Sequence, residues 1–180
     1  WDEAGYLDFT ALAGEIVFKG ARRVRNLLTF TEDFSNAAWQ KINAGTGSAP
    51  VVTSGQTDPD GGATAFRLQL NRGAGNTTGD YSIIRQLALG SALPSVYVKS
   101  NTGATQNFLL GEDAVGYATV NATTSWARVS VPALATATSY WIGSRGGETS
   151  TNSLDLLVWH PQYEDVTGPT TQTASEDVRD

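Results

Sequence analysis

The stretch SVYVKS (residues 95–100) decides the fold class of this chain. Its two valines, Val96 and Val98, alternate with Tyr97 and Lys99, which carry polar atoms. Successive side chains of a β-strand point to opposite faces, so the alternation predicts a strand with both valines in the core. A register slip of one residue would expose both valines, and this fixes the pairing of the strand.

The same strand signals recur along the whole chain at short intervals. ARVSV (127–131) places Val129 and Val131 on one face. Stretches rich in β-branched and aromatic residues predict further strands at 81–89, 105–111, 117–121, 139–144 and 153–160. Glycine, asparagine and aspartate form turns between them, at 57–62, 71–80, 100–104 and 144–153.

Only SNAAWQKI (35–42) indicates a short helical turn, with Ser35 as its cap. Regular short strands without long helical periods predict an all-β chain with few or no helices. The expected architecture is an antiparallel β-sandwich or jelly roll built from two sheets.

Composition excludes several classes of function. The 180 residues contain no cysteine, so disulfides, thiol catalysis and thiolate metal sites are excluded. The net charge is −6, and the strongest basic stretch is Arg22, Arg23 and Arg25, which we interpret as a strand edge. No nucleic-acid partner is therefore expected. No apolar run reaches the roughly 18 residues that span a bilayer, so membrane insertion is not expected. The absence of methionine indicates a fragment or a processed form.

The residues that hydrolytic chemistry requires form no convincing set. His160 is the only histidine, and no serine lies in a G-x-S-x-G motif. A glycosidase needs two facing carboxylates, and neither Glu112 nor Glu148 has an evident partner in the sequence. Asp58 and Asp60 look like part of a calcium loop, but Gln69 stands where a bidentate acid would be required. We interpret that segment as a turn.

Tryptophans are the remaining candidates for binding. Trp39, Trp126, Trp141 and Trp159 lie among strands rich in serine, threonine, asparagine and glutamine. A flat apolar ring with a polar rim can stack on the C–H face of a sugar. Tryptophan in a sandwich also commonly fills the core. Both interpretations remain open for each ring at this point.

Five consecutive segments resemble a known family. They are NLLTFTEDFSNAAW (26–39), DPDGGATAFRL (58–68), SVYVKS (95–100), TSWARVSV (124–131) and LVWHPQYED (157–165). In this order they resemble a jelly-roll module of tailed-bacteriophage tail, fibre and spike proteins. That module is similar to carbohydrate-binding modules of the galactose-binding-like sandwich fold. The resemblance covers the chain from about Arg25 to Asp165.

The resemblance implies a domain organisation and a metal site. Residues 1–24 would be a lead-in strand or linker, 25–166 the jelly-roll module, and 167–180 a C-terminal linker. NLLTFTEDF (26–34) would form the first strand, and Trp39 and Trp126 would serve packing. In some relatives an acid at the end of the first strand and an acid opening the last strand hold a structural calcium. Glu32, Asp33 and Asp155 match those positions, although Thr31 replaces the usual preceding glycine.

The resemblance also implies a function. It favours a non-catalytic module that attaches a phage or phage-like particle to polysaccharide on the bacterial host surface. The alternative is a structural or assembly module of the particle, and a glycan-cleaving enzyme is less favoured. The expected partners include neighbouring virion proteins and copies of the chain, as a homotrimer. The expected location is an external appendage of the virion, and so extracellular.

Alternation predicts which side chains would meet the glycan. If Val96 and Val98 point inward, Tyr97 and Lys99 face outward. The stretch YSIIRQ (81–86), expected beside SVYVKS in the sheet, would present Arg85 on one side together with Tyr81 and Ile83. If Tyr140 and Ile142 point inward, Trp141 and Arg145 face outward. The predicted ligand-binding residues are therefore Tyr97, Lys99, Arg85, Trp141 and Arg145.

Overall fold

The computed structural model describes residues 25–112 and 116–166, and within those ranges the chain forms strands and no helix. No described segment is therefore a helix that could cross a bilayer. The predicted lead-in (1–24) and C-terminal linker (167–180) lie outside the described residues. The nine strands are β1 Trp39–Ala44, β2 Ser48–Gln56, β3 Ala65–Asn71, β4 Tyr81–Ser100, β5 Gln106–Glu112, β6 Gly116–Ala122, β7 Ala127–Ser130, β8 Leu134–Arg145 and β9 Ser153–Asp165.

Strand β4 connects the two layers of the fold. Its first part, Tyr81 to Gln86, lies between β1 and β8, whereas its last part pairs with β9 and β7. The pairing with β8 shifts in register on both sides of Gly90, whose φ of +143° favours glycine. YSIIRQ and SVYVKS were expected to be neighbouring strands. They are instead two halves of one strand of 20 residues.

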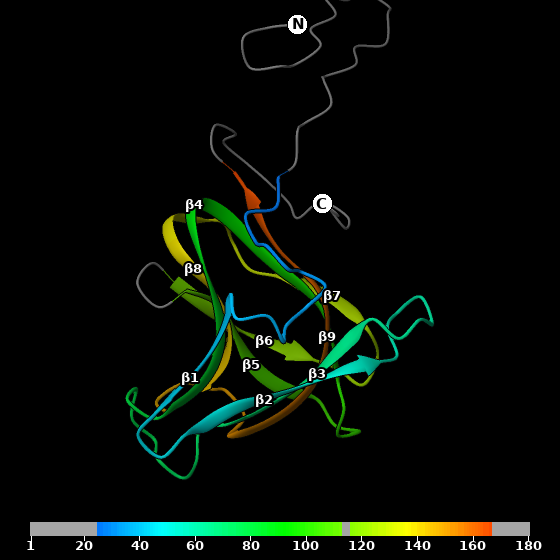
Figure 1. Ribbon diagram of the computed structural model, residues 1–180. Helices are drawn as coiled ribbons and strands as arrows, with labels where there is room; N and C mark the ends of the chain where they lie inside the picture. The colour runs from blue at the N-terminus through cyan, green and yellow to red at the C-terminus, as the bar shows by residue number, and fades with distance from the viewer. Residues whose placement is uncertain (1–24, 113–115, 167–180) are drawn as a thin grey trace, which may run out of the picture.

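Two layers face each other across the core (Figure 1). The first layer contains β1, the first half of β4, β8, β5 and β6; the second contains β2, β3, β9, the second half of β4 and β7. Every pairing between strands is antiparallel. The predicted antiparallel sandwich is confirmed. Because β4 belongs to both layers, its hydrogen bonds join them into a single folded sheet.

The core contains the inward side chains of both layers. Val96 and Val98 are fully buried, as alternation predicted, and so are Tyr140 and Ile142. Val131 is buried as well, while Val129 is half-buried and packs against the core. Aromatic contacts join the elements of the core: Trp39 to Phe34, Phe34 to Phe66, Trp39 to Tyr140, and Tyr140 to Tyr163. Trp39 therefore has the packing role that was expected. Trp126 does not, because it is only partly buried and lies outside the core cluster.

Residues 26–34, expected to be the first strand, form no strand. Asn26 makes one isolated bridge to Glu164, and side chains take over the backbone groups that a ladder would use. The Asn26 side chain accepts from the backbone N of Leu28 and of Tyr163 and donates to Pro161 O. This segment lies along β9 as an irregular strap. Two backbone hydrogen bonds join it to β9, from Leu27 N to Tyr163 O and from Asp165 N to Arg25 O, and the Asn26 side chain supplies the rest of the contact.

The expected helical turn at 35–42 is also absent. Three successive turns precede β1 instead, with hydrogen bonds from Asp33 N to Phe30 O, Asn36 N to Asp33 O, and Trp39 N to Asn36 O. Asp33 rather than Ser35 supplies the capping oxygen, accepting from the backbone N of Ser35 at 3.0 Å. Trp39 is the first residue of β1, and its side chain is buried in the core.

Two aspartates hold the loops at the ends of the sandwich. Asp58 accepts from the backbone N of Asp60, Gly62 and Thr64 and from the Thr64 hydroxyl, which confirms the interpretation of 57–62 as a turn. Asp80 accepts from the backbone N and the hydroxyl of both Thr46 and Thr77. The hydrogen bond from the Thr77 hydroxyl is the largest of several that hold the pKa of Asp80 well below its usual range.

We predict that Leu110→Ala lowers the free energy of unfolding by about 2–5 kcal/mol, because Leu110 is fully buried between the layers and its loss leaves a cavity. Leu87→Ala is the matched control. Leu87 is 60% exposed, so its truncation should change stability by no more than about 0.5 kcal/mol. Urea denaturation of both variants measures the difference. Equal losses would contradict the assignment of the inner and outer faces.

We predict that Asp80→Asn lowers stability at neutral pH and that this deficit disappears in acid. The folded state keeps Asp80 ionised at pH values where the unfolded chain binds a proton, so its contribution is complete above the unfolded pKa of about 3.9. The contribution declines as the pH falls through the lower folded pKa. Thermal unfolding of both proteins between about pH 7 and pH 2 tests this. A deficit that stays constant at low pH would contradict it.

Candidate functional site

A row of side chains crosses all five strands of the first layer on its outer face. In register, Tyr117 of β6 lies opposite Gly111 of β5, Gly111 opposite Trp141 of β8, Trp141 opposite Arg85 of β4, and Arg85 opposite Gln40 of β1. We call these five residues the aromatic row. It brings two rings, a guanidinium and an amide to one surface.

Glycines make room for the rings. Gly111 has a φ of +135°, and a Cβ there would lie 2.6 Å from the Cα of Tyr117. One step further, a Cβ on Gly143 would lie 2.5 Å from Cγ1 of Ile83. Because glycine has no side chain, neighbouring groups can approach the backbone closely at Gly111 and Gly143. Trp141, in the same row, lies deep in this face and is only 6% exposed, although it is not part of the core cluster between the layers.

Polar contacts orient the groups of the row. The Trp141 indole N–H donates to Ser139 Oγ at 3.0 Å. Arg85 Nε donates to Gln40 Oε1 at 2.8 Å. No other side-chain hydrogen bond or ion pair involves Arg85 within residues 25–112 and 116–166. A guanidinium has five N–H donors, so the two Nη groups of this half-buried side chain are available to a ligand.

The loop between β8 and β9 closes one end of the same face. The Tyr117 hydroxyl donates to Glu148 Oε1 at 2.5 Å, and the hydroxyls of Thr119 and Thr149 lie 3.0 Å apart. Arg145 Nε donates to Thr78 O at 2.7 Å, which joins this end to the loop before β4. The contacts fix Tyr117 and Arg145 in place, beside the row.

The structure divides the five predicted ligand-binding residues between two surfaces. Arg85, Trp141 and Arg145 share the outer face of the first layer. Tyr97 and Lys99 lie on the outer face of the second layer, because β4 crosses from one layer to the other between Arg85 and Tyr97. Tyr97 is half-buried there, with the Trp159 ring 5.4 Å away and the Arg128 guanidinium 5.7 Å from its own ring centre.

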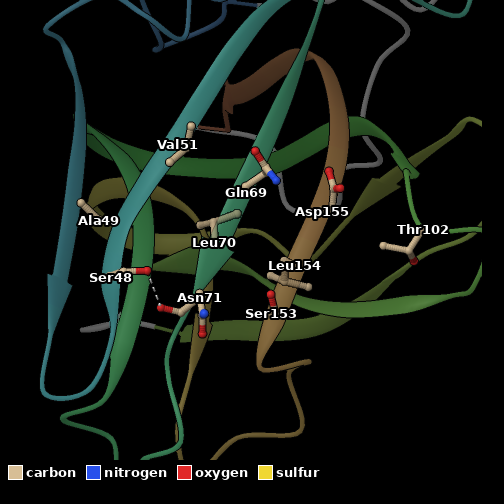
Figure 2. A pocket seen from close by; sticks show the side chains of 10 residues that line it. All are labelled: Ser48, Ala49, Val51, Gln69, Leu70, Asn71, Thr102, Ser153, Leu154 and Asp155. Atoms are coloured by element: carbon tan, nitrogen blue, oxygen red, sulfur yellow. Dashed lines mark hydrogen bonds between the residues drawn. The ribbon is translucent and has the colours of Figure 1, made fainter.

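A shallow polar depression lies on this second face, with a volume of about 420 Å³ (Figure 2). Asp155 and Gln69 project into it from the neighbouring strands β9 and β3. Asp155 forms a bidentate ion pair with Arg67, whose Nε and Nη2 donate to Oδ1 and Oδ2 at 2.7 and 2.6 Å. Asn101 Nδ2 also donates to Oδ1, at 3.2 Å. These contacts lower the pKa of Asp155, with the Arg67 hydrogen bond as the largest cause.

The three residues expected to hold calcium do not come together. Glu32 lies 3.2 Å from His160 Nε2, Asp33 caps its own turn, and Asp155 pairs with Arg67. Among the described residues, no group of three or more histidine, aspartate or glutamate side chains is arranged to hold a metal ion. The expected ligand set therefore does not fit a structural calcium, because each carboxylate has a different partner.

Sequence reasoning missed three residues of these surfaces. Tyr117 could have been found, because it alternates with inward residues in YATVN. Gln40 and Gln69 give no such signal. Their positions depend on pairings with Arg85 and Asp155, which are distant in sequence.

Comparisons with known proteins place the fold. No protein-family model and no curated protein matches the chain. The family 11 carbohydrate-binding module from Clostridium thermocellum, solved with a β-1,3-1,4-mixed-linked tetrasaccharide, is a structural neighbour with a TM-score of 0.51 and 12% identity. The match covers 79% of this chain and 96% of that module.

Two further solved structures are similar over a comparable part of the chain. The enzymatically active domain of tailspike protein 4 from bacteriophage CBA120 has a TM-score of 0.45 and 12% identity, over 77% of this chain and 21% of that one. TmCBM61, solved with β-1,4-galactotriose, has a TM-score of 0.44 and 11% identity, over 77% of this chain and 97% of that one. The family 11 module, with a TM-score above 0.5 but 12% identity, shows the fold alone. The chain has the β-sandwich fold of that carbohydrate-binding module.

We predict that Gly111→Ala destabilises the protein by more than about 1 kcal/mol, because alanine rarely adopts a φ of +135° and its Cβ would collide with Tyr117. Gly79→Ala is the control. Gly79 has an ordinary φ and 3.6 Å to its nearest neighbour, so alanine should be neutral or slightly stabilising. Chemical denaturation compares the two. A tolerated Gly111→Ala would contradict the close approach of β5 and β6.

Proposed function

We propose that the chain is a non-catalytic carbohydrate-binding module whose aromatic row holds a glycan. The observation that carries this proposal is the row itself: two rings and a guanidinium with unused donors share one outer face of the sandwich. The half-buried Tyr117 ring stacks on the C–H groups of a sugar, and the Arg85 and Gln40 side chains bind hydroxyls at the same time, while the buried Trp141 ring supports the row.

The dimensions of the row suit a chain of sugars. Neighbouring strands lie about 4.8 Å apart, so a row across five strands spans about 19 Å. Trp141 forms the floor, and the more exposed Tyr117 and Arg85 lie on either side of it. An oligosaccharide lying across the strands would touch both Tyr117 and Arg85, whereas a single sugar would touch only one of them. The fold shared with a module solved with a mixed-linked tetrasaccharide supports this class of ligand.

The biological setting is part of the proposal. The ordered segments between Arg25 and Asp165 resemble modules of phage tail, fibre and spike proteins, which supports a particle component exposed outside the cell. We propose that the module attaches a phage or phage-like particle to polysaccharide on the bacterial surface. It acts there as a homotrimer beside other virion proteins.

A structural or assembly module is the second candidate. Three exposed apolar side chains favour it: Phe30, Val51 and Leu87, between 53% and 60% exposed. Exposed apolar groups of this kind become buried at contacts between subunits. In that case the aromatic row would be covered in the assembled particle and would bind no glycan. A glycan-cleaving enzyme is less favoured, since Glu112 and Glu148 are engaged by hydroxyl donors within the described residues.

We predict that Arg85→Ala weakens glycan binding at least tenfold, about 1.4 kcal/mol, with little change in thermal stability. Alanine removes the free donors of the row and leaves the core intact. A glycan array identifies the ligand, and calorimetry then measures affinity, starting with the β-1,3-1,4-mixed-linked tetrasaccharide. Trp141 is less suitable for this test, because its burial makes truncation disturb the fold.

Arg25→Ala is the control for the same experiment. Arg25 is exposed and its backbone, rather than its side chain, bonds to Asp165. Its truncation should leave glycan binding unchanged. If the array shows no bound glycan, or if both variants bind as well as the parent chain, the proposed function is wrong.

A further inference from the structure

We propose that the polar depression on the second layer is a second saccharide site, so that one chain binds glycan on both of its outer faces. The second site depends only on the residues that line the depression. The two-sided binding rests on the proposed function of the aromatic row. Figure 2 shows the depression, with Gln69 and Asp155 at its centre. Its volume, about 420 Å³, lies within the 300–1,000 Å³ usual for small-molecule sites.

Strand register brings the groups of the depression together. Val51 of β2 lies opposite Gln69 of β3, and Gln69 lies opposite Asp155 of β9. Beyond Asp155, the backbone N of Asn101 donates to its carbonyl. Side chains directly opposite one another in a sheet have Cβ atoms about 4.5–5.5 Å apart. Asp155 and Gln69 can therefore bind adjacent hydroxyls of one ligand. Further polar side chains line the depression: Ser48, Asn71, Thr102 and Ser153.

Asp155 is a fixed, charged acceptor. Arg67 holds both carboxylate oxygens, and Asn101 donates to one of them, so the carboxylate cannot rotate freely. Because these contacts lower its pKa, Asp155 remains ionised at neutral pH and can accept hydrogen bonds from ligand hydroxyls. Each carboxylate oxygen can accept more than one hydrogen bond, so the protein contacts leave capacity for a ligand.

Gln69 provides the complementary group. Its half-buried amide has no hydrogen-bond partner among residues 25–112 and 116–166. An amide both donates and accepts, which matches a hydroxyl in either role. Beside it, Val51 is 54% exposed and offers an apolar surface to the C–H groups of a sugar ring.

The same chemistry argues against other ligands. Asp155 would repel a phosphate or sulfate, and the one cation that contacts it, Arg67, is already neutralised by it. An apolar ligand would cover the Gln69 amide without giving it a hydrogen-bond partner, which costs free energy. A metal ion would have to displace Arg67 from a single carboxylate. A neutral polyhydroxyl ligand satisfies all of these groups. Lys99 and Tyr97, on the same outer face, extend the polar surface beyond the depression.

Two sites on opposite outer faces would engage different segments of glycan. The faces point away from each other across the core, so a short oligosaccharide cannot reach both. Each chain would therefore link two polysaccharide molecules or two distant segments of one molecule. Such linking raises the strength of attachment without any new contact.

Nuclear magnetic resonance on the whole chain tests the second site. The labelled protein is titrated with the β-1,3-1,4-mixed-linked tetrasaccharide and, separately, with β-1,4-galactotriose. We expect the Gln69 side-chain amide and the backbone amide of Asp155 to shift on saturation with at least one of them. In Gln69→Ala the side-chain amide signal is lost with the residue, so the backbone amide of Asp155 is the readout: the affinity that it reports should fall at least tenfold, while shifts along the aromatic row stay unchanged. Arg85→Ala should instead weaken binding at the aromatic row at least tenfold and leave the shift of the Asp155 backbone amide unchanged.

Gln56→Ala is the matched control, because Gln56 also lies in the second layer but its amide donates to Ser54 O, away from the depression. It should change neither set of shifts. Shifts confined to the aromatic row would overturn the second site and leave the proposed function standing. Shifts confined to the depression would support the second site and count against the aromatic row. No shift with either saccharide would overturn the second site.

Light scattering with polymeric β-1,3-1,4-mixed-linked glucan tests the two-sided binding. The chain is used as a fraction that gel filtration shows to be monomeric, because a homotrimer would link polymer molecules through its separate copies. The monomeric parent chain should produce large particles by linking polymer molecules, and either Gln69→Ala or Arg85→Ala alone should abolish them. Particles that persist in Gln69→Ala would mean that the depression does not cause the linking. If the parent chain produces none, two-sided binding is wrong.

Discussion

The continuity of β4 through both layers is the constraint on which the rest of this structure depends. A sandwich normally keeps its sheets apart, but here one strand of 20 residues supplies hydrogen bonds to both. The register shifts around Gly90, together with its positive φ, carry the strand from one layer to the other. Arg85 and Tyr97 thus belong to one strand yet face outward on opposite sides. The two candidate binding surfaces exist because of this crossing.

Alternation predicted correctly which way the side chains point. Val96, Val98 and Tyr140 are buried as expected, because a two-residue period is a local property that each strand carries in its own sequence. The choice of neighbouring strands is not local. Nothing between residues 81 and 100 marks a strand that continues rather than turns back, so Arg85 and Tyr97 were expected on one surface. The fold class was therefore predictable, while the composition of each face was not.

The acidic segment at residues 26–34 is a second case in which contacts between distant residues could not be predicted from the sequence. Its composition resembles a first strand that ends at a metal site, but its hydrogen bonds are made with residues far along the chain. Gln86 alone accepts from the backbone N and hydroxyl of Thr29 and donates to its carbonyl. Likewise, the pairing of Arg67 with Asp155 joins two strands 88 residues apart and leaves Asp155 unsuited to calcium. Single long-range partners of this kind leave no periodic trace in a sequence.

On both outer faces, polar contacts within the protein hold the side chains that we propose to bind ligand. On the first face, Ser139 orients the Trp141 ring and Gln40 holds Arg85. On the second, Arg67 holds Asp155. Ordering flexible side chains costs about 0.5–1.5 kcal/mol for each one immobilised, so groups already held by the protein bind with a smaller loss of entropy. Under the proposed function, rigid strands and local partners would provide selectivity for hydroxyl geometry without a deep pocket, so that a shallow sheet surface could recognise an extended polymer.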